Sequence, residues 1–227
     1  MNWRGTQTAN RDRLLAKYDA AEVKLYESMG GTLTALDEDA YLSDVERVFT
    51  FRTGLSILDV GAGTGAFCKL LTRIPGLSIT ALEPAPAMLA RLRDNAMLSS
   101  VTTIQGFCDG PHDSEHFPPG EFDVIASRQL GNGLFDPLTA FRNWHTWLSP
   151  GGAVLLVDGL YERSAWRGIW EEEVDVLPLS ACQSMALTPY LLESTGFQIE
   201  AVQLMESTNR LASTKTRRYV VLARKPA

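Results

Sequence analysis

The sequence predicts an α/β protein whose core is one doubly wound, seven-stranded mixed sheet with its last strand antiparallel. Strand-like apolar runs alternate with helical patterns from Leu55 onward, which is typical of parallel strands joined by helices. One apolar run leads into three alternate glycines within residues 61–65, which indicates a buried strand, a tight turn and a helix start. The last two strand-like runs, at 197–204 and 219–224, are expected to pair as a hairpin.

Length and composition set the class of protein before any motif is considered. With 227 residues, of which 45% are hydrophobic and 21% charged, we expect a single domain with a sizeable core. A formal net charge of −6 argues against nucleic acid or an anionic membrane surface as a partner. The three cysteines form no Cys-x-x-Cys pair, and no apolar run is long enough to span a bilayer. These features favour a cytoplasmic protein with reduced thiols and no zinc site.

Residues 1–53 are predicted to form a helical cap that precedes the first strand. Apolar side chains recur at helical spacing through residues 10–29, with Asn10 as a candidate helix cap. A second helix is expected to start at Asp37 or Asp39, with its apolar side chains on one face. Both helices come before the sheet and are therefore additions to its core.

Residues 54–158 form the predicted core of the domain. After the glycine turn and its helix, another helix is expected at Pro84 and Pro86, because proline is tolerated in the first turn of a helix. A further helix is expected to begin at Asp136, where an acid precedes Pro137. The alternating strands are expected at residues 55–60, 78–83, 101–106, 122–127 and 153–158.

Residues 159–187 are predicted to be a variable segment, followed by a C-terminal helix and strand pair over residues 188–227. Ser164 is expected to cap a short helix that carries Trp166 and Trp170 on one face. An aromatic cluster placed here suits a lid or a substrate wall near the mouth of a cleft. A dimer contact or a satellite core is an equally good interpretation.

Two acidic residues stand where the first two strands end. Asp59 lies two residues before the first glycine of the turn, where a carboxylate would repel a pyrophosphate but suits a cationic amino group. Glu83 closes the next apolar run, and an acid at this position can accept hydrogen bonds from both hydroxyls of a ribose. The helix that begins near Gly65 offers unpaired backbone N–H groups to a polar ligand.

The stretch from Asp59 to Gly65 resembles the first motif of the class I S-adenosylmethionine-dependent methyltransferases, and Glu83 resembles the ribose-binding acid of that family. The resemblance continues through residues 122–128 and 148–152. It implies a Rossmann-like fold, S-adenosylmethionine as cofactor and S-adenosylhomocysteine as product. The candidate cofactor-binding residues are Asp59, Gly61, Ala62, Gly63, Gly65, Glu83, Pro84, Met88, Cys108, Asp109, Ser127 and Arg128.

The sequence leaves the adenine contact open. Met88 lies close enough to the turn to touch a bound adenine, although a helical methionine serves equally often in a core. The resembling family usually holds the adenine amino group with an acidic pair after the third strand. Gly106-Phe107 occupies that place here, so the acid is displaced or replaced by Asp109, for which a solvated loop acid is the alternative.

The loop after the fourth strand emerges beside the glycine turn if the sheet is doubly wound. Arg128 is expected to pair with the carboxylate of the cofactor, with a surface ion pair as the alternative, and Gln129 is expected to face the methyl group. Tyr18 or Tyr26 is expected to reach the cleft from the N-terminal helices, unless both only pack their helix. The candidate substrate-binding residues are Tyr18, Gln129, Asn132, Trp166 and Trp170.

No residue stands out in the sequence as a catalytic base. Methyl transfer is an in-line displacement at an already activated sulfonium carbon, so a protein mainly supplies proximity and alignment. His112 and His116 lie in a loop rich in proline and aspartate and are interpreted as solvated, and His145 as a helix-packing residue. No metal site is predicted.

The leading interpretation is methyl transfer from S-adenosylmethionine to a small-molecule acceptor by a monomer or homodimer. An NAD(P)-dependent oxidoreductase is the alternative, because Gly61 to Ala66 also satisfies a dinucleotide-binding pattern, although Asp59 counts against it. A non-catalytic regulator that binds S-adenosylmethionine would show the same motifs. Residues 127–130 lack the Asn/Asp-Pro-Pro-Tyr/Phe signature of methyltransferases that act on amino groups of nucleic acid or on protein glutamine, which favours a small molecule.

Overall fold

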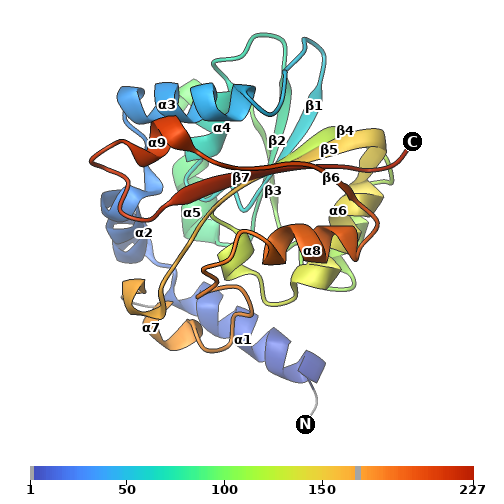
Figure 1. Cartoon of the computed structure of the whole chain (residues 1–227). Coiled ribbons are helices and arrows are strands. Elements are labelled where there is room, and N and C mark those ends of the chain that lie inside the picture. The colour runs from blue at the N-terminus through green and yellow to red at the C-terminus, as the bar shows by residue number, and fades with distance from the viewer. Residues whose placement is uncertain (1–2, 167–169) are drawn as a thin grey trace.

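A seven-stranded sheet forms the centre of the protein, with helices on both of its faces (Figure 1). The computed structural model describes the backbone of residues 3–166 and 170–227, and the side chains of residues 7–28, 31–166 and 171–227. The strands are β1 (Ser56–Val60), β2 (Ser78–Glu83), β3 (Thr102–Gln105), β4 (Phe122–Arg128), β5 (Leu148–Gly159), β6 (Gln198–Leu204) and β7 (Arg218–Arg224). The helices are α1 (Trp3–Lys17), α2 (Ala20–Tyr26), the π-helical turn η1 (Glu27–Gly31), α3 (Ala35–Glu46), α4 (Ala66–Leu71), α5 (Pro86–Arg93), α6 (Pro137–Trp147), α7 (Trp170–Glu173), α8 (Leu187–Glu193) and α9 (Glu206–Asn209), with short 3-10 turns between them.

The strand order β3-β2-β1-β4-β5-β7-β6 makes the sheet doubly wound. From β1 the chain moves outward through β2 to β3, and it then returns to place β4 on the other side of β1. These pairs and the β4–β5 pair are parallel, whereas β7 runs antiparallel between β5 and β6. The predicted mixed sheet with an antiparallel last strand is confirmed. Because the winding direction reverses between β1 and β4, the loops that follow these two strands emerge side by side.

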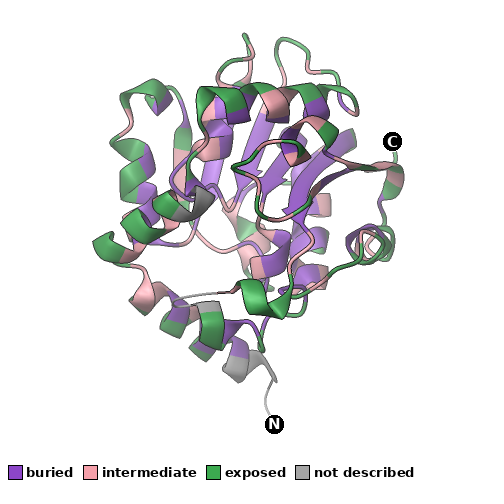
Figure 2. Cartoon of the chain, turned by 60° about the vertical axis from the view of Figure 1, so that its left-hand side comes forward, coloured by how far each residue is buried: buried purple, intermediate pink, exposed green. Residues whose placement is uncertain are grey.

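Two apolar clusters cover the two faces of the sheet. Successive residues of a strand point to opposite faces, so Ile57 packs with side chains of α3 and α4, whereas Leu58 packs with side chains of α6 and α8. Figure 2 shows the strands buried between helices whose outward sides are exposed. Within the described ranges, no helix combines the length and the apolar character needed to cross a membrane.

Two helices, α1 and α2, take the place of the single helix expected over residues 10–29, so that prediction is wrong. Asp19 interrupts it and caps α2, because its side chain accepts hydrogen bonds from the backbone N–H groups of Ala21 and Glu22 at 2.8 and 2.9 Å. Asn10 lies inside α1 and is not its cap.

The next helix, α3, starts earlier than expected. Thr34 is its cap, and the side chain of Asp37 accepts hydrogen bonds from the backbone N–H and the hydroxyl of Thr34 at 2.8 and 2.7 Å. Asp37 is therefore the third residue of the helix, and Asp39 lies deeper inside it. Threonine and aspartate are both good cap residues, so the local sequence did not separate them.

The segment after β5 does not form the predicted helix with both tryptophans on one face. Ser164 lies inside a 3-10 turn, and Trp166 has an extended backbone with φ −75° and ψ 138°. α7 is described over Trp170–Glu173, and the side chain of Trp170 lies outside the described residues. Glu173 of α7 ties this segment to α1, because Arg13 donates two hydrogen bonds to its carboxylate at 3.0 and 2.9 Å.

Candidate functional site

A cavity of about 290 Å³ opens at the carboxyl ends of the parallel strands. Its wall contains residues that directly follow β1, β2, β3 and β4, where the loops of a doubly wound sheet gather. The helices α1 and α2 and the segment after β5 contribute the rest of the wall. Of the residues predicted from the sequence, those in the wall are Tyr18, Gly61, Gly63, Glu83, Pro84, Met88, Cys108, Asp109, Gln129, Asn132 and Trp166.

The other predicted cofactor residues lie outside the wall of the cavity. The Ser127 hydroxyl donates to the carbonyl of Val60 at 3.2 Å and joins β4 to β1. Gly65 has a φ of 90°, and a Cβ added there would lie 2.5 Å from Cδ1 of Leu98, so backbone conformation and packing require this glycine. The predicted residues outside the wall are Asp59, Ala62, Gly65, Ser127 and Arg128.

The glycine turn brings bare backbone to the cavity. Gly61 and Gly63 have φ values of 69° and 57°, in the left-handed region that favours glycine. A Cβ at Gly61 would lie 2.7 Å from Cδ1 of Leu130, so the glycine lets the loop after β4 approach the turn. A Cβ at Gly63 would lie 3.5 Å from the hydroxyl of Tyr26, which places the end of α2 over the same turn.

Glu83 ends β2 with its carboxylate buried at the wall of the cavity. Oε2 accepts a hydrogen bond from the backbone N–H of Gly63 at 2.9 Å, and Oε1 accepts one from that of Ala85 at 2.8 Å. Burial raises the pKa of Glu83 to about 7, and the two N–H donors oppose this shift. Each carboxylate oxygen keeps a second lone pair, so Glu83 retains the capacity to accept hydrogen bonds from two adjacent hydroxyls.

Asp59 is buried in β1, next to the glycine turn. Oδ2 accepts a hydrogen bond from the Cys68 thiol at 3.0 Å, whereas the buried Oδ1 has no hydrogen-bond partner among the described residues. Burial raises the pKa of Asp59 to about 6, opposed by the Cys68 thiol and by the positive charge of Arg128. A buried acceptor without a donor is costly. Glu83 in the wall therefore fits the hydroxyls of a nucleoside, and the negative charge of Asp59 behind the glycine turn favours a cationic amino group nearby.

Arg128 is buried, so its interpretation as a surface ion pair is wrong. Nη1 donates to Oε1 of Gln129 at 2.6 Å, and Nη2 donates to the carbonyl of Gly31 at 3.3 Å. The guanidinium carbon lies 6.0 Å from the ring centroid of Tyr41 in α3. Arg128 therefore joins the loop after β4 to the end of η1 and holds a positive charge behind the cavity wall.

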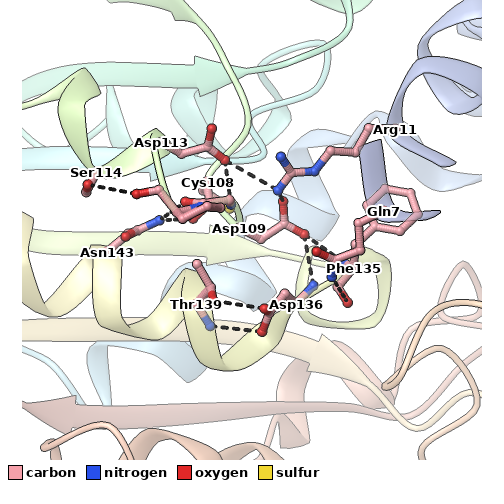
Figure 3. Close-up of polar contacts among 12 residues, drawn as sticks. Gln7, Arg11, Cys108, Asp109, Asp113, Ser114, Phe135, Asp136, Thr139 and Asn143 are labelled. Atoms are coloured by element: carbon pink, nitrogen blue, oxygen red, sulfur yellow. Dashed lines mark hydrogen bonds and ion pairs between the residues drawn. The ribbon is translucent and has the colours of Figure 1, made fainter. Parts of the chain in front are cut away.

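The acid after β3 is Asp109, and it is not a solvated loop acid, because only 2% of it is exposed. Figure 3 shows its two oxygens facing different elements. Oδ1 pairs with the guanidinium of Arg11 in α1, and Oδ2 accepts from the backbone N–H groups of Phe135 and Asp136 at 2.7 and 3.2 Å. Asp109 thus ties α1 to the loop that starts α6, and Gln7 reinforces the tie by donating to the carbonyl of Phe135 at 3.1 Å.

The wall also contains residues that the sequence did not single out. Tyr26 reaches it as well as Tyr18, although only Tyr18 was among the candidate substrate-binding residues. Tyr161, two residues past β5, was missed because it lies in a segment without periodicity, and only its place at the carboxyl end of a strand could have indicated it. Further wall residues outside the lists of candidates include Leu14, Leu15, Gly31, Leu134 and Phe135.

The histidines lie outside the cavity wall. The side chain of His112 is 88% exposed, as expected. His116 is not solvated, because its Nε2 is buried, and a Cβ added at Gly106 would lie 2.4 Å from that atom. His145 packs its ring against Phe197 at a centroid distance of 5.2 Å, which confirms a helix-packing role. No cluster of three or more His, Cys, Asp or Glu side chains in the described part of the chain is arranged to hold a metal ion.

The sequence matches a known protein family and, separately, several curated proteins. Residues 35–202, from α3 into β6, match the family described as methyltransferase domain. The ubiquinone biosynthesis O-methyltransferase of Xanthomonas campestris is 30% identical over 103 residues, which are 45% of this chain and 42% of that protein. The match thus spans less than half the length of this curated relative.

Solved structures share the fold at low sequence identity. The phosphoethanolamine N-methyltransferase 2 of Haemonchus contortus, in complex with S-adenosyl-L-methionine, matches with a TM-score of 0.63 at 20% identity, over 83% of this chain and 53% of that one. The S-adenosylmethionine dependent methyltransferase from Mesorhizobium loti matches with a TM-score of 0.62 at 23% identity, over 84% of this chain and 100% of that one.

Proposed function

Because the chain belongs to the methyltransferase-domain family, we propose that it transfers a methyl group from S-adenosylmethionine to a small-molecule acceptor. The pair of buried acids at the ends of β1 and β2 carries this proposal. Asp59 keeps an oxygen without a partner among the described residues, which suits an amino group. Glu83, anchored by the N–H groups of Gly63 and Ala85, keeps lone pairs for the two hydroxyls of a ribose.

The surrounding wall suits the other parts of this cofactor. Met88 and Phe107 stand in the wall after β2 and β3, where we place the adenine. The glycine turn presents its backbone to the amino-acid end, and the charge of Arg128 behind the wall favours a carboxylate there. When bound, S-adenosylmethionine supplies a methyl group on a sulfonium, with a leaving group that is already activated. The residues of the wall contribute alignment and the exclusion of water.

The acceptor is placed beside the amino-acid end of the cofactor, between α2, residues 129–133 and the segment after β5. In this arrangement residues 1–53 act as a cap and residues 159–187 as a substrate wall on a core of residues 54–158, within one domain. The net charge of −6 supports a small molecule over nucleic acid as the acceptor.

The oxidoreductase alternative loses its support at the same residues. A buried carboxylate at Asp59, next to the turn, is unfavourable for a pyrophosphate, and the matched family is one of methyltransferases. A regulator that binds S-adenosylmethionine without catalysis differs from the proposed enzyme only in turnover.

Calorimetric titration with S-adenosylhomocysteine tests the cofactor site. Glu83→Ala should weaken binding by about 1–3 kcal/mol, because two ribose hydroxyls lose their acceptor. Glu115→Ala is the matched control, since the Glu115 side chain is 78% exposed, and it should leave the affinity unchanged. Unchanged affinity in Glu83→Ala, or tight binding of NADH by the wild type, would contradict the proposal. Incubation with labelled S-adenosylmethionine and a panel of acceptors, followed by mass analysis, separates an enzyme from a regulator.

A further inference from the structure

Three side chains from separate parts of the chain meet at one oxygen atom in the wall of the cavity. Gln129, just after β4, donates from Nε2 to the hydroxyl oxygen of Tyr161 at 2.8 Å. Arg218, the first residue of β7, donates from Nη1 to the same oxygen, and its guanidinium carbon lies 5.2 Å from the Tyr161 ring centroid. Gln129 and Tyr161 form part of the cavity wall, and Arg218 lies outside it.

The direction of these hydrogen bonds is fixed by Arg128. Its Nη1 donates to Oε1 of Gln129 at 2.6 Å, and a guanidinium has only donors to offer. The amide oxygen of Gln129 must therefore face Arg128, which leaves the amide nitrogen to face Tyr161. Arg218 can likewise only donate. Each described side chain paired with the Tyr161 hydroxyl is therefore a donor.

A phenol oxygen that receives two hydrogen bonds must donate its own proton elsewhere. The group carries one proton and two lone pairs, and Gln129 and Arg218 occupy the lone pairs. Burial raises the pKa of Tyr161, so the proton is present at neutral pH. No described residue accepts that proton in a hydrogen bond, and Tyr161 borders the cavity. The hydroxyl proton is therefore available to a ligand in the cavity.

The backbone of Gln129 supports a functional role for this arrangement. Its φ is 59°, and among the described residues it is the one non-glycine residue with a positive φ. Its N–H donates to the carbonyl of Val157 at 2.8 Å, which holds the residue in this unfavourable conformation next to β5. Such strain persists mainly where a site requires it, and here it aims the amide of Gln129 at Tyr161.

The charges around this hydroxyl favour an anion. Arg218 contacts the Tyr161 oxygen directly, and Arg128 lies one hydrogen bond further along the chain of donors. Asp158 is the acid near Tyr161, but its two oxygens accept the backbone N–H groups of Gly159 and Asn132 at 2.7 and 3.2 Å, and it is outside the cavity wall. The ring of Trp166, 5.7 Å from that of Tyr161, adds a flat apolar surface.

We propose that Gln129, Tyr161 and Arg218 form an oxyanion-binding corner, in which the Tyr161 hydroxyl donates to an anionic oxygen on a planar ring of the methyl acceptor. This inference rests on the proposed methyl transfer and names the acceptor class that the same cavity takes. Tyr161 contacts the acceptor, whereas Gln129 and Arg218 are positioning residues that set the direction of its hydrogen bond. The corner selects ring oxyanions and disfavours ammonium cations.

Three 4-nitrobenzene derivatives that differ in charge test the inference on the full chain saturated with S-adenosylhomocysteine. They are 4-nitrophenol, whose ionised form has its own absorption band, the neutral 4-nitroanisole, and the cationic 4-nitro-N,N,N-trimethylanilinium. We expect bound 4-nitrophenol to ionise at a lower pH than the free compound, and the anion to bind more tightly than the other two ligands. Equal affinities, or preference for the cation, would overturn the inference.

Three variants separate the contribution of the Tyr161 hydroxyl to anion binding from the contributions of neighbouring side chains. Tyr161→Phe should weaken binding of 4-nitrophenolate by about 10- to 100-fold, the usual value of a hydrogen bond to a charged group, and leave 4-nitroanisole unaffected. Gln129→Glu should cause a similar loss without removing the hydroxyl, because the new carboxylate accepts the Tyr161 proton and turns it from the cavity. Tyr219→Phe is the matched control, since it removes a buried hydroxyl that pairs with Thr188 at 3.2 Å outside the cavity wall, and it should bind normally.

The affinity for S-adenosylhomocysteine distinguishes two kinds of failure. If the wild type does not bind it, the proposed function fails. If the wild type binds it but Tyr161→Phe and Gln129→Glu keep full preference for the anion, only the oxyanion corner is wrong. Normal binding of S-adenosylhomocysteine by both variants shows that they are folded. A loss in Gln129→Glu alone would overturn the inference, because the new negative charge in the wall repels an anion without any contribution from the Tyr161 hydroxyl.

Discussion

The two halves of the cavity are assembled in different ways. The half proposed to bind the cofactor (the cofactor half) lies mainly within residues 59–88 and uses backbone conformation: three glycines with positive φ and two acids anchored at adjacent strand ends. The half proposed to bind the acceptor (the acceptor half) joins Gln129, Tyr161 and Arg218 from three distant strand ends through side-chain hydrogen bonds. A backbone turn is encoded by a few neighbouring residues, whereas a side-chain network depends on how the whole sheet folds. The first half is therefore readable as a motif, and the second is not.

The two halves also differ in the sign of their buried charge. The cofactor half buries the carboxylates of Asp59 and Glu83, and the pKa values of both are raised by burial. The acceptor half places Arg218 behind uncharged wall residues, and Arg128, whose charge also acts on Asp59, borders both halves. Buried charges of both signs therefore lie close to the cavity.

The largest expected effect concerns the backbone of the cofactor half. Gly65 and Gly54 have the same φ of 90°, but a Cβ at Gly65 would lie 2.5 Å from Leu98, whereas one at Gly54 would meet nothing within 4 Å. Gly65→Ala combines left-handed strain with overpacking and should cost about 2–5 kcal/mol of unfolding free energy. Gly54→Ala adds only the strain and should cost about 1–2 kcal/mol. Urea unfolding of the two variants gives the difference, and equal losses would show that packing at the turn is unimportant.

The next effect is the pH dependence caused by Glu83, whose pKa is raised by burial from 4.5 to about 7. Between these values the folded protein holds a proton that the unfolded chain has released, so the free energy of unfolding falls as the pH rises through this window. The loss amounts to at most about 3 kcal/mol. In Glu83→Gln this loss should be absent, because the amide does not ionise.

Urea unfolding of wild type and Glu83→Gln at about pH 5 and about pH 8 measures this effect. The wild type should lose more stability than the variant between the two conditions. Asp59 shifts in the same direction, with a pKa of about 6, but it is present in both proteins and cancels in the comparison. Parallel pH dependence in the two proteins would mean that burial does not raise the pKa of Glu83 in the folded protein.

The same contrast explains how much the sequence could predict. The apolar runs and the glycine turn were enough to predict the doubly wound mixed sheet and the position of Glu83 at the cavity, because each of these signals lies within a few residues. Asp109 was recognised, but its ion pair with Arg11 was not, since that contact joins α1 to the loop after β3. Tyr161 had no periodic pattern around it, and its role depends on Arg218, which only the antiparallel insertion of β7 beside β5 brings near.

Substitution of Trp166 in the cavity wall should have a smaller effect, confined to ligands of the acceptor half. Trp166→Ala should weaken binding of 4-nitrophenolate and 4-nitroanisole alike, by about 0.5–1.5 kcal/mol, because both lose a ring contact. This differs from Tyr161→Phe, in which only the anion is affected. Affinity for S-adenosylhomocysteine should not change, and Tyr190→Ala, at a residue 64% exposed on α8, is the control. A change of subunit mass in light scattering with normal ligand binding would instead assign Trp166 to a dimer contact.

The smallest expected effect tests whether the acceptor half stores strain for function. At a φ of 59°, a side chain costs about 1–2 kcal/mol relative to glycine. Gln129→Gly relieves that strain while losing the hydrogen bonds to Arg128 and Tyr161, so its stability should stay within about 1 kcal/mol of the wild type. Gln203→Gly makes the same substitution at an exposed position of β6, where it relieves nothing and should cost about 0.5–1 kcal/mol.

Urea unfolding compares these two glutamine variants, and 4-nitrophenolate binding is measured on the same samples. We expect Gln129→Gly to be at least as stable as Gln203→Gly and yet to lose the preference for the anion, which Gln203→Gly should keep. That combination would mean that the glutamine is retained at an unfavourable backbone position for the hydrogen bond it gives to Tyr161. If Gln129→Gly proves much less stable than Gln203→Gly, the network holds β4 to β5, and the positive φ is a consequence of packing and not of ligand binding.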